Sequence, residues 1–242
     1  MKKTLALCGA WLVLGAPAAL AGLDLTWNAC NVDGGVPDIV ADCATGGPYE
    51  LVGCFEAPAE LSGFVGMDIY IDLQAEAPGL SPFWHFEDGG CNAGGLVVSG
   101  DRSAVTGGCT APTPWDAGTS VSMTAYGAGL GGANRARLLC SVTRLSGTPL
   151  EAGQNYYGFH LRVLTTHASE AGGACAGCPD KMAMVWNQCD LFNQGGVGPP
   201  VASVTAPGSH GSCAGWNGPS TTTCATTPVR NRTWGQIKVL YR

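Results

Sequence analysis

The stretch FVGMDIYIDLQ, residues 64–74, alternates between apolar and polar side chains. Successive side chains of a β-strand point to opposite faces of a sheet, so this alternation separates a buried face from a wet one. The apolar set is Val65, Met67, Ile69, Ile71 and Leu73. The polar set is Asp68, Tyr70, Asp72 and Gln74. The pattern predicts a strand with one face in a hydrophobic core and the other in water.

Two further segments, 154–164 and 134–142, show the same alternation. The side chains that they are expected to bury are Tyr157, Phe159, Leu161 and Val163, and Ala136, Leu138, Cys140 and Val142. Those expected to face water are Tyr156, His160 and Arg162, and Arg135 and Arg137. Weaker strand patterns occur at 23–28, 49–56, 83–88, 96–100, 120–126 and 182–191.

The chain has 37 glycines and 15 prolines, which interrupt it too often for long helices. One-sided strands are typical of antiparallel sheets with one face in water. Strands and long helical patterns do not alternate, which argues against a doubly wound α/β fold. We therefore predict an all-β fold: a disulfide-stapled antiparallel β-sandwich of the jelly-roll, immunoglobulin or cohesin-like kind, with a short C-terminal helix.

The sequence divides into four parts. Residues 1–21 read as a secretory signal peptide, because a Lys2–Lys3 start and a short apolar run precede the small-residue site Ala19-Leu20-Ala21. Residues 22–192 hold the sandwich, and 193–228 form an irregular Gly/Pro/Ser/Thr-rich excursion with a short strand near 201–205. Residues 229–242 follow a capping-box pattern and predict an amphipathic helix packed on the domain, with a disordered tail as the alternative.

Composition restricts the partners. Only 12% of residues are charged, against a usual ~25%. Removing the first 21 residues takes away Lys2, Lys3 and Cys8, which changes the formal charge from −6 to −8 and the cysteine count from 12 to 11. An acidic chain is poorly suited to nucleic acid or anionic lipid surfaces. We expect a soluble extracytoplasmic protein, secreted or at the cell surface, without membrane insertion after signal cleavage.

Eleven cysteines in an exported chain predict disulfides and one cysteine left over. Pairing between neighbours in sequence is the simplest scheme, and a 15-residue loop closed this way contributes about 3 kcal/mol. The expected pairs are Cys30–Cys43, Cys91–Cys109, Cys175–Cys178, Cys213–Cys224 and Cys140–Cys189, with Cys54 unpaired. The sequence does not prove this connectivity.

The segment GGACAGCPDK, residues 172–181, has the C-x-x-C spacing of redox dithiols and zinc sites. A redox pair needs a lowered thiol pKa, and Lys181 is the one nearby cation. A structural zinc site needs four ligands, and Cys189 and His167 are the other candidates near in sequence. We favour a structural disulfide over both alternatives and predict no metal and no cofactor.

No catalytic residue is predicted, because no nucleophile elbow, metalloprotease helix or fixed Ser–His–carboxylate pattern is present. A polysaccharide-acting hydrolase is the alternative. Its candidate acids are Asp68, Asp72, Glu87 and Asp88. Asp68 and Asp72 lie about 13 Å apart along one strand, too far for a glycosidase pair, so any second carboxylate must come from another strand.

A polar and aromatic surface is the candidate ligand site. If the strands at 64–74 and 154–164 were neighbours, tyrosine rings and charged groups would form a flat platform for sugars. An ordinary solvated sheet face is the alternative. The candidate ligand-binding residues are Asp68, Tyr70, Asp72, Trp84, Tyr156, His160 and Arg162.

Several segments together resemble a group of uncharacterised secreted bacterial proteins. They are the signal peptide, GLDLTWNAC, VGMDIYIDLQ, GGANRARLL, AGQNYYGFHLRVL, GACAGC and the end TWGQIKVLYR. The hydrophobic alternation is similar, more loosely, to cohesin-like and carbohydrate-binding sandwiches, although the added cysteines depart from the cohesin pattern. Neither resemblance carries an activity or functional residues over to this chain.

These observations lead to one expectation and two alternatives. We expect a secreted, non-catalytic β-sandwich for extracellular binding, adhesion or matrix structure, with a polysaccharide or a surface protein as partner. The first alternative is the hydrolase. The second is a self-assembling envelope component in which the odd cysteine bonds a second molecule.

Overall fold

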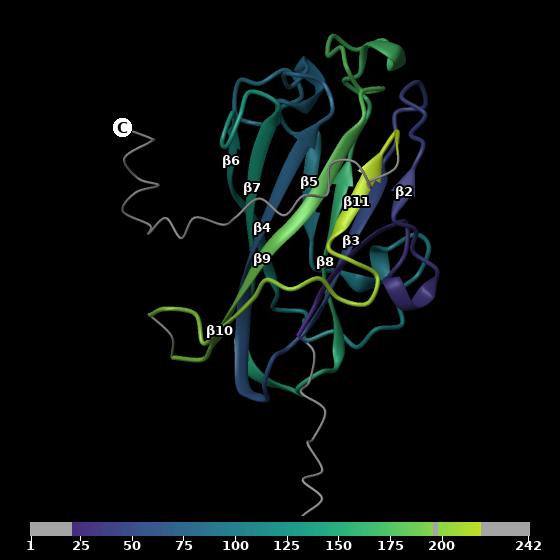
Figure 1. Ribbon diagram of the computed structural model, residues 1–242. Coiled ribbons are helices and arrows are strands. Elements are labelled where there is room, and N and C mark those ends of the chain that lie inside the picture. Colours follow the sequence, from purple (N-terminus) through teal and green to yellow (C-terminus); the bar gives the residue numbers. More distant parts are fainter. Residues whose placement is uncertain (1–20, 196–197, 219–242) are drawn as a thin grey trace, which may run out of the picture.

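A computed structural model describes residues 21–195 and 198–218 (Figure 1). Its strands are β1 (Leu23–Trp27), β2 (Asp38–Ile39), β3 (Tyr49–Glu56), β4 (Leu61–Ala75), β5 (Leu96–Ser99), β6 (Ser120–Ala128), β7 (Arg135–Leu150), β8 (Asn155–Val163), β9 (Met182–Asn193), β10 (Ala202–Val204) and β11 (Cys213–Trp216). Its helices are single 3₁₀ turns: η1 (Asn31–Asp33), η2 (Pro82–Trp84), η3 (Arg102–Ala104) and η4 (Ser169–Ala171). The predicted C-terminal helix and all but Ala21 of the predicted signal peptide lie outside the described residues.

The strands form two sheets, and the predicted all-β sandwich is confirmed. The small sheet has the order β1-β3-β8-β5. The large sheet has the order β2-β11-β9-β4-β7-β6, with β10 also paired to β9. All pairs are antiparallel except β11 with β2. In Figure 1 the large sheet lies in front of the small one.

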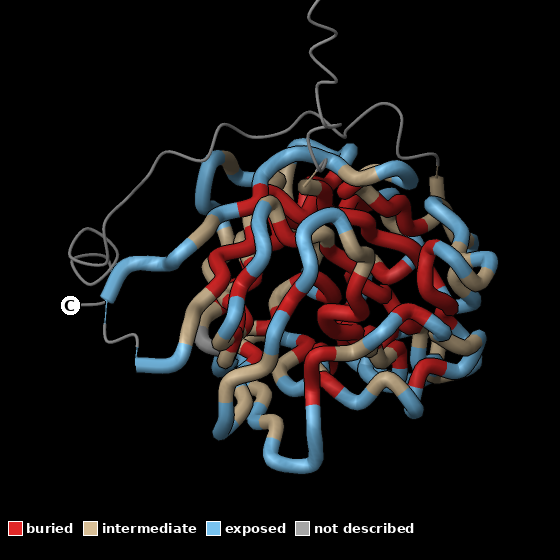
Figure 2. The backbone as a smooth tube through the Cα atoms, turned by 90° about the horizontal axis from the view of Figure 1, so that it is seen from below, coloured by how far each residue is buried: buried red, intermediate tan, exposed pale blue. Residues whose placement is uncertain are grey.

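The apolar face of β4 forms the centre of the interior. Met67, Ile69, Ile71 and Leu73 are at most 1% exposed, as the alternation predicts, whereas Val65 is partly exposed. The core residues predicted on β7 are also buried. Phe159 of the small sheet meets Trp186 of the large sheet edge to face, with ring centroids 4.9 Å apart. Figure 2 shows this continuous buried interior, with exposed loops around it.

A β-bulge in β8 corrects part of the predicted pattern. Gly53 of β3 pairs with Phe159 and Cys54 pairs with Tyr157, so Gly158 is an extra residue in β8. One extra residue reverses the facing of everything on one side of it. Tyr156 therefore packs inward on Phe55, with ring centroids 5.9 Å apart, whereas Tyr157 lies on the outer face. The alternation had predicted the opposite for both tyrosines.

The expected strand at 83–88 is also wrong, because this segment contains η2 and a loop. Its aromatic residues close one end of the core. Trp84 is fully buried and packs edge to face on Trp216, with ring centroids 5.4 Å apart. The Trp84 indole donates to the Gly177 carbonyl at 3.2 Å, and the Trp216 indole donates to the Cys178 carbonyl at 2.8 Å.

The Gly- and Pro-rich part of the chain contributes to the large sheet. β10 confirms the short strand expected near 201–205. β11, which was not predicted, pairs with β9 and carries Trp216 into the aromatic end of the core. Residues 196–197 and 219–228 of the predicted excursion lie outside the described residues.

Three disulfides have both cysteines in the described residues, and none is a predicted pair. They are Cys30–Cys109, Cys43–Cys178 and Cys91–Cys175. Their cysteines are 79, 135 and 84 residues apart, and loops of this length correspond to about 4–5 kcal/mol each in the chain-entropy model. Cys213 is also disulfide-bonded, and its predicted partner Cys224 lies outside the described residues.

The C-x-x-C pair is structural, but not as a local bridge. Cys175 and Cys178 each bond a different distant loop, so this segment joins the loops around Cys91 and Cys43 to one another. Neither sulfur is left to serve as a redox dithiol or as a zinc thiolate.

The predicted bond between Cys140 and Cys189 is absent. Both residues pair with Ile69, from opposite sides of β4. Two interstrand spacings, about 10 Å, separate them, whereas a disulfide needs Cα atoms within about 7 Å. Cys54, Cys140 and Cys189 are buried free thiols, which confirms the unpaired state predicted for Cys54.

We expect peptide mapping of the non-reduced protein to recover the three described pairs. Cys54, Cys140 and Cys189 should react with a thiol reagent only after denaturation, because burial raises the pKa of each thiol. Rapid labelling of any of the three in the native protein would contradict this arrangement.

Replacing Gly53 by alanine should destabilise the sandwich. A Cβ at Gly53 would overlap the Phe159 ring, which is held against Trp186. Overpacking of this kind costs about 1–3 kcal/mol. Gly79→Ala is the matched control, since no heavy atom lies within 4 Å of its Cβ position. Thermal unfolding should show a lower Tm for Gly53→Ala alone, and equal Tm values for the two variants would refute the packing argument.

Candidate functional site

The structure separates the predicted platform residues. Asp68, Tyr70 and Asp72 are on β4 of the large sheet, whereas His160 and Arg162 are on β8 of the small sheet. The inner faces of these strands form the shared core, so the two groups of side chains point outward from opposite faces of the sandwich. The strands are not neighbours, so the predicted platform does not form. Trp84 is in the core and Tyr156 faces inward, which removes both from a ligand surface.

The outer face of the small sheet is covered by loops. Several of its outward-facing residues are at most 5% exposed, namely Asp24, Thr26, Glu50, Val52, Cys54, Tyr157 and His160. The loops around η1 and after η3 lie over them. The backbone N–H of Thr106 donates to the Glu50 carboxylate at 2.7 Å, and that of Cys30 donates to the Gly108 carbonyl at 3.2 Å. The Cys30–Cys109 disulfide joins the two loops.

His160 is part of this buried layer and does not face water as predicted. Its Nδ1 lies 2.9 Å from the Tyr157 hydroxyl, and its Nε2 has no hydrogen-bond partner among the described residues. Burial lowers the pKa of His160, and the nearby Glu50 carboxylate opposes this shift. The imidazole is therefore kept neutral and enclosed, where it serves the structure and cannot reach a substrate.

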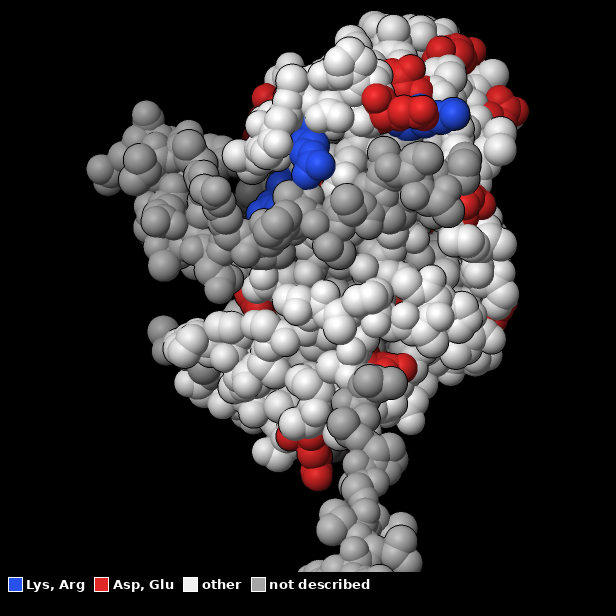
Figure 3. Space-filling model, in the orientation of Figure 1, with Lys and Arg blue, Asp and Glu red and all other residues white. Residues whose placement is uncertain are grey.

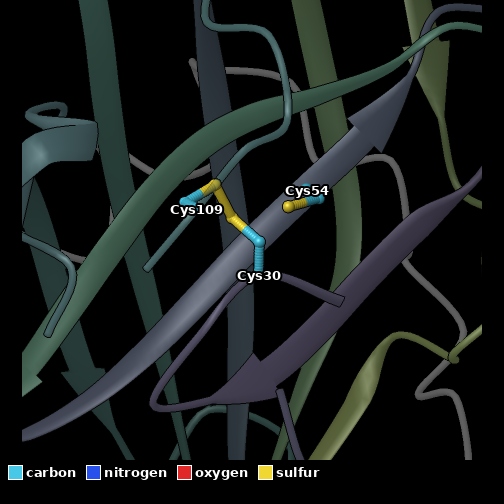
Figure 4. Close-up of side chains that lie close together, drawn as sticks. All are labelled: Cys30, Cys54 and Cys109. Atoms are coloured by element: carbon cyan, nitrogen blue, oxygen red, sulfur yellow. A yellow bond between two sulfur atoms is a disulfide. The ribbon is translucent and has the colours of Figure 1, made fainter. Parts of the chain in front are cut away.

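Three sulfur atoms meet in the same layer. Figure 4 shows the Cys54 side chain beside the Cys30–Cys109 disulfide. The sulfurs of these three residues all lie within 4.8 Å of one another. Three thiolates at this spacing would suit a soft metal ion, but two of these sulfurs are bonded to each other. Burial raises the pKa of Cys54 to about 12, so its thiol is also a poor nucleophile at neutral pH. In the oxidised protein the cluster is structural.

A second group lies on the outer face of the large sheet. Its residues are partly open to solvent, except for Asp190, which is 7% exposed. We call it the Asp68–Asp190 cluster and define it as Asp68, Tyr70, Ser141, Gln188, Asp190 and Ser203. β4 is the central contributor: Asp68 pairs with Asp190 of β9 on one side and with Ser141 of β7 on the other, and Tyr70 pairs with Gln188. Directly opposite residues have Cβ atoms about 4.5–5.5 Å apart, so the two carboxylates are close neighbours.

Hydroxyl and amide donors hold these carboxylates in place. Ser141 donates to Asp68 at 2.5 Å. Ser203 and the Gln188 amide donate to one oxygen of Asp190, at 2.5 and 2.7 Å. Burial raises the pKa of Asp68, the Ser141 hydrogen bond opposes this, and the charge of Asp190 adds to it. Burial and the same two carboxylates also raise the pKa of Tyr70, so its hydroxyl stays protonated.

Of the other predicted acids, Asp72 and Glu87 are engaged elsewhere, and Asp88 is exposed in the loop after η2. Asp72 is 4% exposed and accepts two hydrogen bonds from Arg137, at 2.5 and 2.8 Å. Glu87 pairs with His85 at 2.7 Å in the loop after η2, and Arg162 lies 3.9 Å from Glu50. Of the seven predicted ligand-binding residues, Asp68 and Tyr70 thus remain together on a partly open surface. Asp190 was not predicted as a site residue. The alternation within β9 does not reveal which residues of β9 lie opposite Asp68 and Tyr70 of β4.

The buried His160 makes stability depend on pH. With a native pKa below the unfolded value of about 6.5, the unfolded chain binds the proton more readily. The contribution of neutral His160 to the free energy of unfolding is complete above pH 6.5. It is lost as the pH falls towards the lowered native pKa, and the free energy of unfolding then changes by at most about 1.4 kcal/mol per pH unit. Denaturant unfolding across this window should show a smaller slope for His160→Gln than for the wild type, and identical slopes would contradict this assignment.

None of the helices in the described residues is long and apolar enough to cross a membrane. Comparisons of the chain with models of known protein families, with curated proteins and with solved structures found no match.

Proposed function

We propose that this chain is a secreted, non-catalytic binding protein whose ligand surface is the Asp68–Asp190 cluster. The ligand class that we propose is extracellular polysaccharide. The observation that carries this proposal is the placement of the partly open Tyr70 and Asp68 on a central strand, with the buried carboxylate of Asp190 beside them.

The chemistry of the cluster suits a sugar. A tyrosine ring offers a flat apolar surface for the apolar face of a sugar ring. Carboxylates that are already oriented accept hydrogen bonds from sugar hydroxyls, and such charge-assisted bonds are stronger than neutral ones. Side chains on a strand in the middle of a sheet are held more precisely than those on loops. Figure 3 shows the molecule in the orientation of Figure 1, and most of the described surface in this view is uncharged. An uncharged surface suits a neutral polymer.

The environment of the reactive groups supports binding without catalysis. His160 and the free thiols are buried, and burial raises the pKa of each thiol. The three described free cysteines are at most 1% exposed, which also argues against self-assembly through an intermolecular disulfide at one of them.

Tyr70→Ala and Asp68→Asn should each weaken binding to whichever glycan the wild type retains on an array. We expect a loss of about tenfold for Tyr70→Ala, which corresponds to about 1.4 kcal/mol. Glu60→Gln, in the exposed turn before β4, is the charge-matched control and should bind normally. Retention of no glycan by the wild type, or equal binding by all variants, would refute the proposal.

One observation favours the hydrolase as a second candidate. Two carboxylates face each other across β4 and β9, and burial raises the pKa of Asp68, as the general acid of a glycosidase needs. If the cluster is catalytic, the wild type should release reducing ends from a polysaccharide panel, and Asp68→Asn and Asp190→Asn should each abolish the release. Turnover that survives both substitutions would remove this candidate.

A further inference from the structure

Charge is divided unevenly along the chain. All 18 acidic residues lie between Asp24 and Asp190, and residues 22–218 contain six basic residues, which gives a formal charge of −12. Residues 219–242 contain Arg230, Arg232, Lys238 and Arg242 and no acidic residue, which gives +4. Opposite charges on one chain attract, especially where one set is concentrated in a short segment.

The described chain ends next to the large sheet. Residue 218 follows β11, whose Cys213 pairs with Val185 of β9, which in turn pairs with Asp72 of β4. Directly paired residues share a face, and Asp72 meets Arg137 on the outer face. Cys213 is thus on the outer face of the large sheet, and it is disulfide-bonded. The sequence predicts Cys224 as its partner, and a bond to Cys224 would tether the basic segment to the same face as the Asp68–Asp190 cluster.

The outer face also provides matching chemistry. Asp68 and Asp190 are neighbouring carboxylates, whereas Arg137, on the same face, is already held by Asp72. Leu139, Ala183 and Val185 are apolar residues on that face, and they are 8%, 0% and 1% exposed. The segment 229–242 has the complementary mixture of four cations with Trp234, Ile237, Leu240 and Tyr241.

The chain is long enough to reach. Three interstrand spacings separate β11 from β7, about 14 Å in total. The 18 residues after Cys224 span up to about 60 Å when extended.

We propose that the C-terminal segment, residues 229–242, docks on the outer face of the large sheet with its basic side chains against Asp68 and Asp190. It would then be an intramolecular ligand that competes with an external one. That consequence rests on the proposed function, whereas the docking itself does not.

Zero-length carbodiimide cross-linking of the full chain after signal removal tests the docking. Residues 22–242 contain only two lysines, Lys181 and Lys238. Lys181 lies 3.4 Å from Glu76, so a Lys181–Glu76 cross-link is the internal control for a native fold. Mass spectrometry should also find Lys238 joined to Asp68 or Asp190. In 1 M salt, where the screening length is about 3 Å, this second cross-link should decrease.

Matched variants separate the outcomes. Asp68→Asn combined with Asp190→Asn should lose the Lys238 cross-links and keep the Lys181 control, whereas Glu60→Gln should lose neither. Absence of Lys238 cross-links to the two aspartates in the wild type, while the control forms, would overturn the proposal. Cross-links that join differently isotope-labelled chains would also overturn it, because the occupant would then be a second copy. Docking without glycan binding would refute the proposed function alone.

Discussion

The inward face of β4 is the element on which the rest of the structure depends. Its four apolar side chains lie between β9 and β7 within the large sheet and pack towards the small sheet. Fully burying one such side chain is worth about 1.5–3 kcal/mol. A slip of one residue in its register would turn Asp68, Tyr70 and Asp72 into the core, so the same apolar face also fixes which side chains reach the outer surface.

The two outer faces of the sandwich differ because the large sheet keeps a partly open region at Asp68 and Tyr70, although Asp72 on the same face is 4% exposed. On the small sheet, the loops around η1 and η3 bury Glu50, Cys54 and His160, and the Cys30–Cys109 bond joins these loops. On the large sheet, Asp68 and Tyr70 remain partly open. A polar residue on an outward-facing strand position is therefore a binding candidate only when no loop is packed over it.

Sequence patterns predicted the strands well and the contacts between them poorly. Alternation located β4, β7 and β8, because burial on one face leaves a period of two in the residues themselves. The alternation gave the wrong facing for Tyr156 and Tyr157. Gly158 is an extra residue in β8, and nothing in the apolar pattern of the sequence signals this insertion. Asp190 and the partners of Cys91 and Cys43 were missed for a different reason. They depend on which distant strands and loops meet, and that information is spread over the whole chain.

The connectivity of the C-x-x-C segment has a consequence for how the chain forms its disulfides. Two cysteines separated by two residues meet far more often in an unfolded chain than cysteines 84 or 135 residues apart. A bond between Cys175 and Cys178 is therefore the product favoured early in oxidation, and it would occupy both sulfurs that the native bridges require. We expect maturation to depend on thiol–disulfide exchange that opens this early bond, and hence on a disulfide isomerase where the protein folds.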